Sequence, residues 1–559
     1  MNFKKILICF FVFLIVVGVA IRVVAITKSF GAEETDFVKP AIAIINTGHP
    51  LFYLSEQQPN EMALWHPPMY IYSMAFIFKI FGVSETSARS INIVFSLLTT
   101  ILIFLFSIKI FERKGKLIGI IASSFFLINY YVLSSSIMID IDILSSFFVF
   151  AFIFCILMNY EWKRGVYAIL AVFSFVFSLA NRYPVAILVF FSIFLYFLIK
   201  KEARHYAKTL FFIGITGSLI SLLIWIIYST IIEPGTFFSF IIHNAKLGSE
   251  QFLSLRVYFF SFLLNISQFI RLVTLPATIL IIVSFFYFLK RKEVEIRILI
   301  IYSFIILASF LAVPRPAFGY PRYFLSAFPG LAILISLLII ENIKKIKFDN
   351  KTLIIVLLGF VGSLILLLIF SPNPTFYQSN GLIMATNLPD FIINLACISP
   401  IFFALFARKN QRKALLILML FAIFFAYCFY FDAQLVLNNS YTRAAGSYIK
   451  SHTSTGDLIV CPKAVGYYVE RKFYVNDNNK PPINNLSWGY IKEYLQKIIS
   501  NKQMNDEFFW ENGFFGGINN PKPTQDVLNL AKYVVLYHKV NNTLPETQIG
   551  DFYIYRLNK

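Results

Sequence analysis

Charged residues are scarce in this chain. Only 14% of its 559 residues are Asp, Glu, Lys or Arg, whereas 58% are hydrophobic and 65 are Phe. Soluble domains of this length are far less apolar, and long apolar runs recur along most of the sequence. The shortage of charge therefore excludes a soluble globular protein and predicts an all-α polytopic membrane protein.

Cysteine is also scarce, and common catalytic motifs are missing. The five cysteines have spacings that predict neither a disulfide framework nor a metal site. The sequence has no nucleotide-phosphate loop, no serine nucleophile elbow and no Rossmann fingerprint. The missing nucleotide motifs argue against a nucleotide-sugar donor on the cytoplasmic side.

The apolar runs predict about 13 transmembrane helices. The first run follows Lys4-Lys5 and has no cleavage motif, so we expect it to be retained as a helix. The fifth and sixth runs are short and share the hinge Asn181-Arg182-Tyr183-Pro184. The predicted spans are 6–26, 88–111, 117–136, 143–160, 165–181, 183–199, 209–231, 272–289, 296–313, 322–341, 352–371, 389–407 and 413–432.

Positive residues explain the orientation that we expect. The net charge of +20 is concentrated in alternate linkers, while the opposite linkers are longer and poorer in Lys and Arg. The positive-inside rule then places the N-terminus in the cytoplasm, and an odd number of spans places the C-terminus outside the plasma membrane. The location of the positive residues in one set of linkers therefore explains the net charge better than binding to nucleic acid does.

Two segments should lie on the outer side. Loop one, residues 27–87, contains an apolar stretch from Met69 to Phe81 that is too short to cross and should lie in the interface. Beyond residue 433 the pattern predicts a helix over 437–452 and strands at 457–461, 532–538 and 552–556. The chain should therefore comprise a transmembrane domain, 1–432, and a small extracytoplasmic α/β domain, 433–559.

Acidic residues gather at the predicted outer surface. Glu33, Glu34 and Asp36 open loop one, and Asp140 and Asp142 precede the fourth span. A carboxylate in an apolar run is costly unless it is partnered or hydrated. These residues either mark the water boundary or meet in one cavity, where carboxylates can deprotonate a substrate, bind a cation or orient a hydroxyl.

Basic residues on that side favour an anionic ligand. Arginine forks match phosphate oxygens and lysine supplies a point charge, so the set as a whole favours a lipid phosphate. Snorkelling to headgroups is the alternative for any one member. The set comprises Arg182, Lys246, Arg256, Arg271, Arg315 and Arg322.

Three histidines lie on the same side. His49, His66 and His243 do not form a recognisable zinc motif, and hydrogen-bonding roles explain them as well. The stiff backbone of Trp65-His66-Pro67-Pro68 makes His66 the best placed of the three to face a ligand.

The opening of the chain resembles that of the GT-C membrane glycosyltransferases. These include protein O-mannosyltransferases, the aminoarabinose transferase acting on lipid A, and related polyprenyl-phosphate-dependent transferases. A second acidic motif is similar to Asp142-Ile143-Leu144, and a late basic-aromatic pair is similar to Arg322-Tyr323. The likeness covers roughly residues 5–340. The matching residues of the opening are Glu33-Glu34, Phe37, Ala41, Gly48, His66-Pro67-Pro68, Phe81-Gly82-Val83-Ser84-Glu85 and Arg89.

The resemblance implies a GT-C fold and a reaction. Such enzymes transfer a sugar, with inversion, from a dolichyl or undecaprenyl phosphate in the outer leaflet to a protein, lipid or glycan acceptor. It implies Glu33 as base, with Glu34 and Asp142 as the other catalytic carboxylates, which position sugar or acceptor. No cofactor is required, and a divalent cation is compatible with the acidic clusters. Lys246, Arg182 and Arg322 would hold the lipid phosphate. Taken together, the residues and the resemblance predict these substrate-binding residues: Asp36, His66, Asp140, Arg182, His243, Lys246, Arg322 and Tyr323.

The sequence departs from the family pattern at two places. Glu33-Glu34 stands where the family usually has Asp-Glu, and the extra methylene moves the carboxylate by about one carbon–carbon bond. Arg182-Tyr183 stands where the family usually has Lys-Gly before the sixth span.

Three other functions fit parts of the sequence. A transporter or lipid flippase would explain the spans but would leave loop one and the outer domain without a role, and no inverted repeat is evident. A non-catalytic assembly or receptor protein would not need the acidic residues of loop one. An oligosaccharide ligase or polymerase acting on a lipid diphosphate is a related enzymatic alternative.

Overall fold

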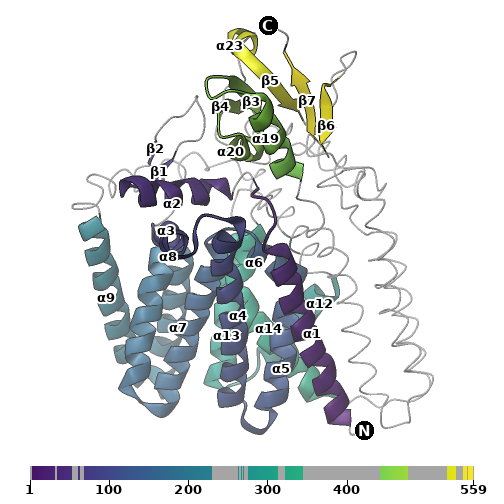
Figure 1. Ribbon diagram of the computed structural model, residues 1–559. Helices are drawn as coiled ribbons and strands as arrows, with labels where there is room; N and C mark the ends of the chain where they lie inside the picture. Colours follow the sequence, from purple (N-terminus) through teal and green to yellow (C-terminus); the bar gives the residue numbers. More distant parts are fainter. Residues whose placement is uncertain are drawn as a thin grey trace, which may run out of the picture.

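The structure is a computed structural model in which a helical bundle carries a sheet-containing unit at one end (Figure 1). It describes residues 3–31, 34–52, 61–62, 68–228, 262, 266, 269, 275–311, 321–343, 441–475, 525–536, 545–549 and 552–557. The first elements are α1 (Phe3–Ala25), α2 (Thr35–Thr47), the antiparallel pair β1 (Leu51–Phe52) and β2 (Glu61–Met62), α3 (Met69–Phe81), α4 (Glu85–Ile110), α5 (Glu112–Ile128) and α6 (Tyr130–Ile137). The bundle continues with α7 (Asp142–Trp162), α8 (Gly165–Ile199), η1 (Lys201–Ala203), α9 (Arg204–Ile227), α12 (Leu275–Phe288), α13 (Val294–Leu311), η3 (Pro321–Ala327) and α14 (Phe328–Ile343).

The bundle is a multi-pass membrane unit. Among the described residues, six helices are long and apolar enough to cross a membrane, or seven if α5 and α6 form one broken span. The most buried of them are α7 and the 324–342 segment, which form the centre of the bundle. The predicted spans 352–371, 389–407 and 413–432 lie outside the described residues, so the predicted total of about 13 stays a prediction.

The element α8 is a helical hairpin. Arg182 has φ −150° and ψ 75°, and Pro184 follows it, so the helical hydrogen bonding is interrupted there. The ring centroids of Phe175 and Phe190 are 5.1 Å apart. In a straight helix, 15 residues would separate the two positions by about 22 Å. The two arms therefore fold back on each other, and they coincide with the predicted spans 165–181 and 183–199.

The predicted span 117–136 is bent rather than continuous. Helix α5 ends at Ile128, and the axis turns by 67° into α6. Arg22 of α1 is fully buried and donates to the Leu127 carbonyl at 2.9 Å. The Asn129 side chain accepts from the Tyr131 N–H at 3.0 Å. These bonds replace helical partners that the break removes.

Two short turns position loop one over the bundle. Gly48 ends α2 with φ 81°, a left-handed conformation that a side chain would strain, and its N–H bonds the Ile44 carbonyl at 2.9 Å. Ser84 and Ser87 form a capping box that starts α4 immediately after α3. Helix α2 consequently lies across the ends of the bundle helices, beneath the sheet unit (Figure 1).

The sheet unit is a mixed α/β structure. Its sheet has the order β4-β3-β5-β7-β6, with β3 parallel to β4 and β5, and β7 antiparallel to β5 and β6. Three of its strands lie where the sequence predicts strands; β4 and β6 were not predicted. Its elements are α19 (Tyr441–His452), β3 (Leu458–Cys461), α20 (Lys463–Val469), β4 (Lys472–Val475), α23 (Gln525–Leu530), β5 (Ala531–Leu536), β6 (Thr547–Ile549) and β7 (Phe552–Arg556).

The sheet unit shares a hydrophobic core with loop one. Buried Ile459 and Phe473 of the sheet belong to the same cluster as Phe30, Phe37 and Tyr70. Burial of shared apolar surface makes this a packed contact rather than a tethered domain.

Candidate functional site

Glu34 is the centre of a buried network of hydrogen bonds at the loop-one end of the bundle. We call this network, which joins Glu34 to Arg89, Gly31 and Ile139, the latch. Its Oε2 lies 2.7 Å from Arg89 Nη2, and the two side chains are 6% and 0% exposed. Oε2 also accepts from the Gly31 N–H at 2.6 Å, and Oε1 accepts from the Ile139 N–H at 3.0 Å. Because protein donors engage both oxygens, this geometry favours a positioning role for Glu34 over contact with sugar or acceptor.

Arg89 completes the latch from α4. Its guanidinium donates to the Ser29 and Ile137 carbonyls at 3.0 Å each, and also to the Lys28 carbonyl. A single side chain thus joins the α1–α2 connection to the end of α6. Sequence analysis identified Arg89 only as a motif residue and did not predict its pairing with Glu34.

The segment that carries Asp140 is fixed by α3 and α4. Tyr70 is fully buried and donates from its hydroxyl to Asn92 Oδ1 at 2.9 Å, and Asn92 Nδ2 donates to the Asp140 carbonyl at 2.9 Å. The Asp140 carboxylate accepts from the Ile141 N–H at 2.5 Å. Together with the Glu34–Ile139 bond, this brings the two acidic segments to one place.

Asp142 and Arg182 form an ion pair near the same end of the bundle. Asp142 opens α7 and is buried, and Arg182 lies at the turn of the α8 hairpin with its side chain 11% exposed. The guanidinium carbon is 5.4 Å from the centroid of the Phe310 ring on α13. Asp142, one of the predicted catalytic carboxylates, and Arg182, one of the predicted phosphate ligands, are therefore direct partners.

The predicted basic-aromatic pair lies in η3, which packs against α7. Ser146, one turn after Asp142, donates to the Leu325 carbonyl at 3.4 Å. The ring centroids of Phe310, on α13, and Phe324, in η3, are 6.1 Å apart. The backbone of Arg322-Tyr323 consequently belongs to the same end of the bundle as Asp142 and Arg182.

The sheet unit holds the segment that leads into Glu34. We call the contacts of Tyr468 and Arg443 with this segment and with Glu85 the clamp. Tyr468 of α20 accepts from the Phe30 N–H at 2.6 Å and donates to Glu85 Oε1 at 2.9 Å. Arg443 of α19 binds Glu85 at 2.6 Å and the Thr27 carbonyl at 3.1 Å. Glu85 and Arg89 are four residues apart on α4, so one helix face holds both the clamp and the latch.

Lys28 adds a titratable group beside the latch. Burial lowers the pKa of its ammonium to about 8; Glu34 acts in the opposite direction, and Arg89 lowers the pKa further. Lys28, Tyr468 and Arg443 were not predicted, because their roles depend on contacts between distant parts of the sequence.

Four predicted site residues lie outside the described residues: Glu33, His66, His243 and Lys246. Asp36 lies in the first turn of α2 and is partly buried. Within the residues that the structure does describe, no group of three His, Cys, Asp or Glu side chains has a metal-binding arrangement.

Comparison with known proteins identifies the architecture. The family model described as dolichyl-phosphate-mannose-protein mannosyltransferase matches residues 65–228, which include Arg89, Asp142 and Arg182. The crystal structure of ArnT from Cupriavidus metallidurans bound to undecaprenyl phosphate matches with a TM-score of 0.63 and 12% identity, over 83% of this chain and 85% of ArnT. The chain has the GT-C fold of membrane glycosyltransferases.

Other GT-C structures and one sequence relative are also similar. The archaeal oligosaccharyltransferase AglB from Archaeoglobus fulgidus, in complex with an inhibitory peptide and a dolichol-phosphate, has a TM-score of 0.51 at 12% identity, over 96% of this chain and 70% of AglB. An uncharacterised protein of Aquifex aeolicus is 22% identical over 325 residues, 56% of this chain and 60% of that relative. The match thus spans less than two thirds of the relative's length.

Proposed function

We propose that this GT-C protein transfers a sugar from a polyprenyl phosphate to a hydroxyl of a protein, lipid or glycan acceptor on the outer side of the plasma membrane. The observation that carries the proposal is the convergence of two acidic segments and Arg182 at the loop-one end of the bundle. ArnT, which has a similar fold, was crystallised with undecaprenyl phosphate.

In the proposed reaction, Glu33 accepts the proton of the acceptor hydroxyl. The hydroxyl oxygen attacks the anomeric carbon, the bond between that carbon and the phosphate oxygen breaks with inversion, and the electron pair leaves with the lipid phosphate. Glu33 directly precedes Glu34, so the latch restricts where the base can lie. We assign Glu34 and Arg89, the two charged members of the latch, the role of positioning Glu33.

Arg182 is proposed to hold the leaving phosphate, together with Lys246 and Arg322. A guanidinium is a planar fork with two edges, so one edge can bind Asp142 while another meets phosphate oxygens. In this arrangement Asp142 occupies one edge of Arg182 and partly neutralises its charge. Cations already face both Glu34 and Asp142, and no step of the proposed reaction depends on a metal ion.

The test is a matched pair of variants at this ion pair. Arg182→Gln should weaken binding of a polyprenyl phosphate by about 1.5–3 kcal/mol, the scale of hydrogen bonds to charged groups. Asp142→Asn breaks the same pair but leaves the guanidinium uncompensated, so it should bind the phosphate at least as tightly as wild type. Equal losses in both purified variants would show a purely structural pair and would remove Arg182 from the phosphate site.

A further inference from the structure

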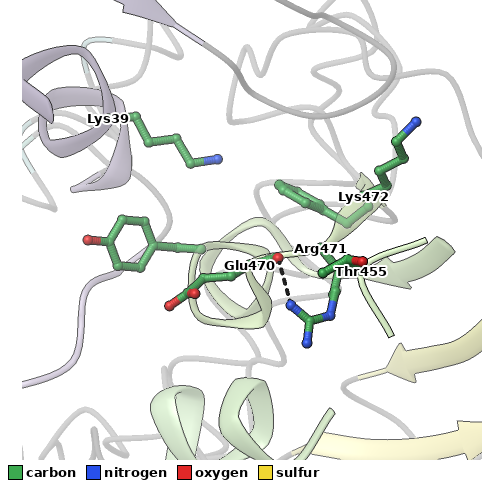
Figure 2. A pocket seen from close by; sticks show the side chains of 8 residues that line it. Lys39, Thr455, Glu470, Arg471 and Lys472 are labelled. Carbon is green, nitrogen blue, oxygen red and sulfur yellow. Dashed lines mark hydrogen bonds between the residues drawn. The ribbon is translucent and has the colours of Figure 1, made fainter. Parts of the chain in front are cut away.

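The open cavity between α2 and the sheet unit does not present its polar groups to one point. It has a volume of about 500 Å³, and Lys39, Arg471 and Lys472 are among the residues that line it. Figure 2 shows these three side chains pointing in different directions. A ligand is oriented where a few polar groups converge, and such a convergence lies instead beside the Asp142–Arg182 ion pair.

Two buried oxygen atoms near this ion pair have no hydrogen-bond partner among the described residues. They are Ser145 Oγ on α7 and Asn181 Oδ1 on α8. Both residues are 0% exposed. A buried polar atom without a partner is destabilising, so two of them on neighbouring helices indicate a polar group that binds there.

Contacts between α7 and α8 bring Ser145 and Asn181 to the same level of the bundle. The rings of Phe148 and Phe177 stack with their centroids 4.9 Å apart. Ser145 lies three residues before Phe148, and Asn181 lies four residues after Phe177, so each shares a helix face with its aromatic neighbour. These steps amount to about 4.5 Å and about 6 Å along the two helices, toward loop one in both cases. Both residues therefore lie between the aromatic stack and the ion pair.

The other contacts of Asn181 determine which of its atoms is left without a partner. Its Nδ2 donates to the Phe177 carbonyl at 2.8 Å and to Met69 Sδ, at the start of α3, at 3.4 Å. A carbonyl oxygen can only accept, so the amide nitrogen must face it and the remaining atom is the amide oxygen. Asn181 thus offers an acceptor, while the Ser145 hydroxyl has a hydrogen to donate.

We propose that Ser145 and Asn181 bind a hydroxyl group of the donor sugar. A hydroxyl suits both atoms, because it can donate to Asn181 Oδ1 while it accepts from Ser145 Oγ. An ionised phosphate or carboxylate, which only accepts, would be repelled by the Asn181 oxygen. The inference rests on the proposed function, since Arg182, which directly follows Asn181, is the residue proposed to hold the donor phosphate.

The assignment makes Ser145 and Asn181 determinants of sugar recognition. A buried site that bonds a hydroxyl discriminates against a ligand that lacks it, because the protein atoms are then left without a partner again. Entry of the sugar requires the loop-one ends of α7 and α8 to separate, and the helical hydrogen bonding is already interrupted at Arg182. A lipid phosphate without sugar would keep the contact with Arg182 and would not use the two buried atoms.

The experiment measures binding of decaprenyl phosphate, with and without a sugar, to the purified full-length protein in detergent. The sugar is mannose, glucose or 4-amino-4-deoxyarabinose, whichever wild type binds most tightly. Ser145→Ala and Asn181→Leu should each weaken binding of the sugar-bearing lipid about tenfold, because one hydrogen bond to the sugar is lost. Binding of decaprenyl phosphate alone should stay unchanged.

The matched controls remove buried groups whose partners lie within the protein. Ser178 on α8 donates to the Ser174 carbonyl at 2.8 Å. Asn159, at the other end of α7, accepts from the Tyr206 hydroxyl at 2.8 Å and donates to the Arg164 carbonyl at 2.9 Å. Ser178→Ala and Asn159→Leu should therefore leave the affinities for both lipids unchanged.

Three results would overturn the inference. Equal losses for the two lipids in Ser145→Ala and Asn181→Leu would show that these residues only support the ion pair. Unchanged binding of both lipids would assign the two oxygen atoms to a buried water molecule. A wild type that binds neither lipid would contradict the proposed function and this inference with it. A protein that shows the expected binding pattern but transfers no sugar would contradict the proposed reaction and leave this inference standing.

Discussion

At the scale of single residues, Arg89 of α4 joins two other segments at the loop-one end. It is completely buried, it pairs with Glu34, and it donates to three backbone carbonyls from two segments. Burial of a charge is tolerated only when partners replace its hydration. The pair therefore acts as a unit, and removal of either member leaves the other buried and unmatched.

Arg89→Met should lower the free energy of unfolding by about 3–5 kcal/mol, the usual cost of breaking a buried ion pair from one side. Adding Glu34→Gln should cost less than the sum of the two single changes, because the second change removes the unmatched carboxylate. Thermal unfolding of the purified variants in detergent measures both effects. Strict additivity would show that the two side chains do not interact.

Lys28 should make the free energy of unfolding depend on pH, and a single substitution can test its contribution. Its pKa of about 8 lies below the ordinary value of 10.5, so between these values the unfolded chain binds more protons than the folded one. The free energy of unfolding should therefore rise with pH across this window. Lys28→Met should lose that rise, measured as the difference in Tm between pH 7.5 and pH 10. Identical slopes for wild type and variant would contradict the shift.

At the scale of elements, the sheet unit and α4 define the course of loop one. Tyr468 and Arg443 hold the segment from Thr27 to Phe30, while Arg89 holds the residues around Ser29 and Glu34. The sheet unit thus supports the segment that leads into Glu34. This gives the tail beyond residue 433 a role that no motif indicated.

Tyr468→Phe and Arg443→Gln should each lower kcat for sugar transfer about tenfold while the KM for the lipid donor stays unchanged, because they displace the proposed base, Glu33, and not the proposed phosphate ligands. The matched control is Lys532→Gln, which breaks the 2.8 Å ion pair with Asp457 inside the sheet unit and does not touch loop one. Equal kcat losses in the control would reduce the clamp to a general stability effect.

Element boundaries were predictable where hydropathy changes sharply. The predicted spans 88–111 and 143–160 correspond to α4, Glu85–Ile110, and α7, Asp142–Trp162. The break at Asn129 was not predictable, because apolar residues continue on both sides of it and its support comes from Arg22 of another helix. Local patterns report burial and the proline hinge of α8, whereas the break at Asn129 depends on a partner that is distant in sequence.

At the scale of the whole molecule, the GT-C fold was predictable from the spacing of a few motifs, and the site was predictable only in part. The residue types at Glu34, Asp142 and Arg182 indicated chemistry, but their pairings did not follow from the sequence. Glu34 binds a residue 55 positions away, and the sheet unit reaches Glu85 across 358 positions. Such contacts are set by packing of the complete chain.

The most direct test of the account is transfer of a labelled sugar from polyprenyl phosphate by purified wild type, Glu33→Gln, Glu34→Gln and Asp36→Asn. Wild type should transfer the sugar. Glu33→Gln should bind donor normally, stay folded and lose transfer at least about a hundredfold, the scale of general-base catalysis. Glu34→Gln should lose less, through positioning. Normal turnover in Glu33→Gln would contradict the account, and it would do so most clearly if Glu34→Gln or Asp36→Asn were inactive instead.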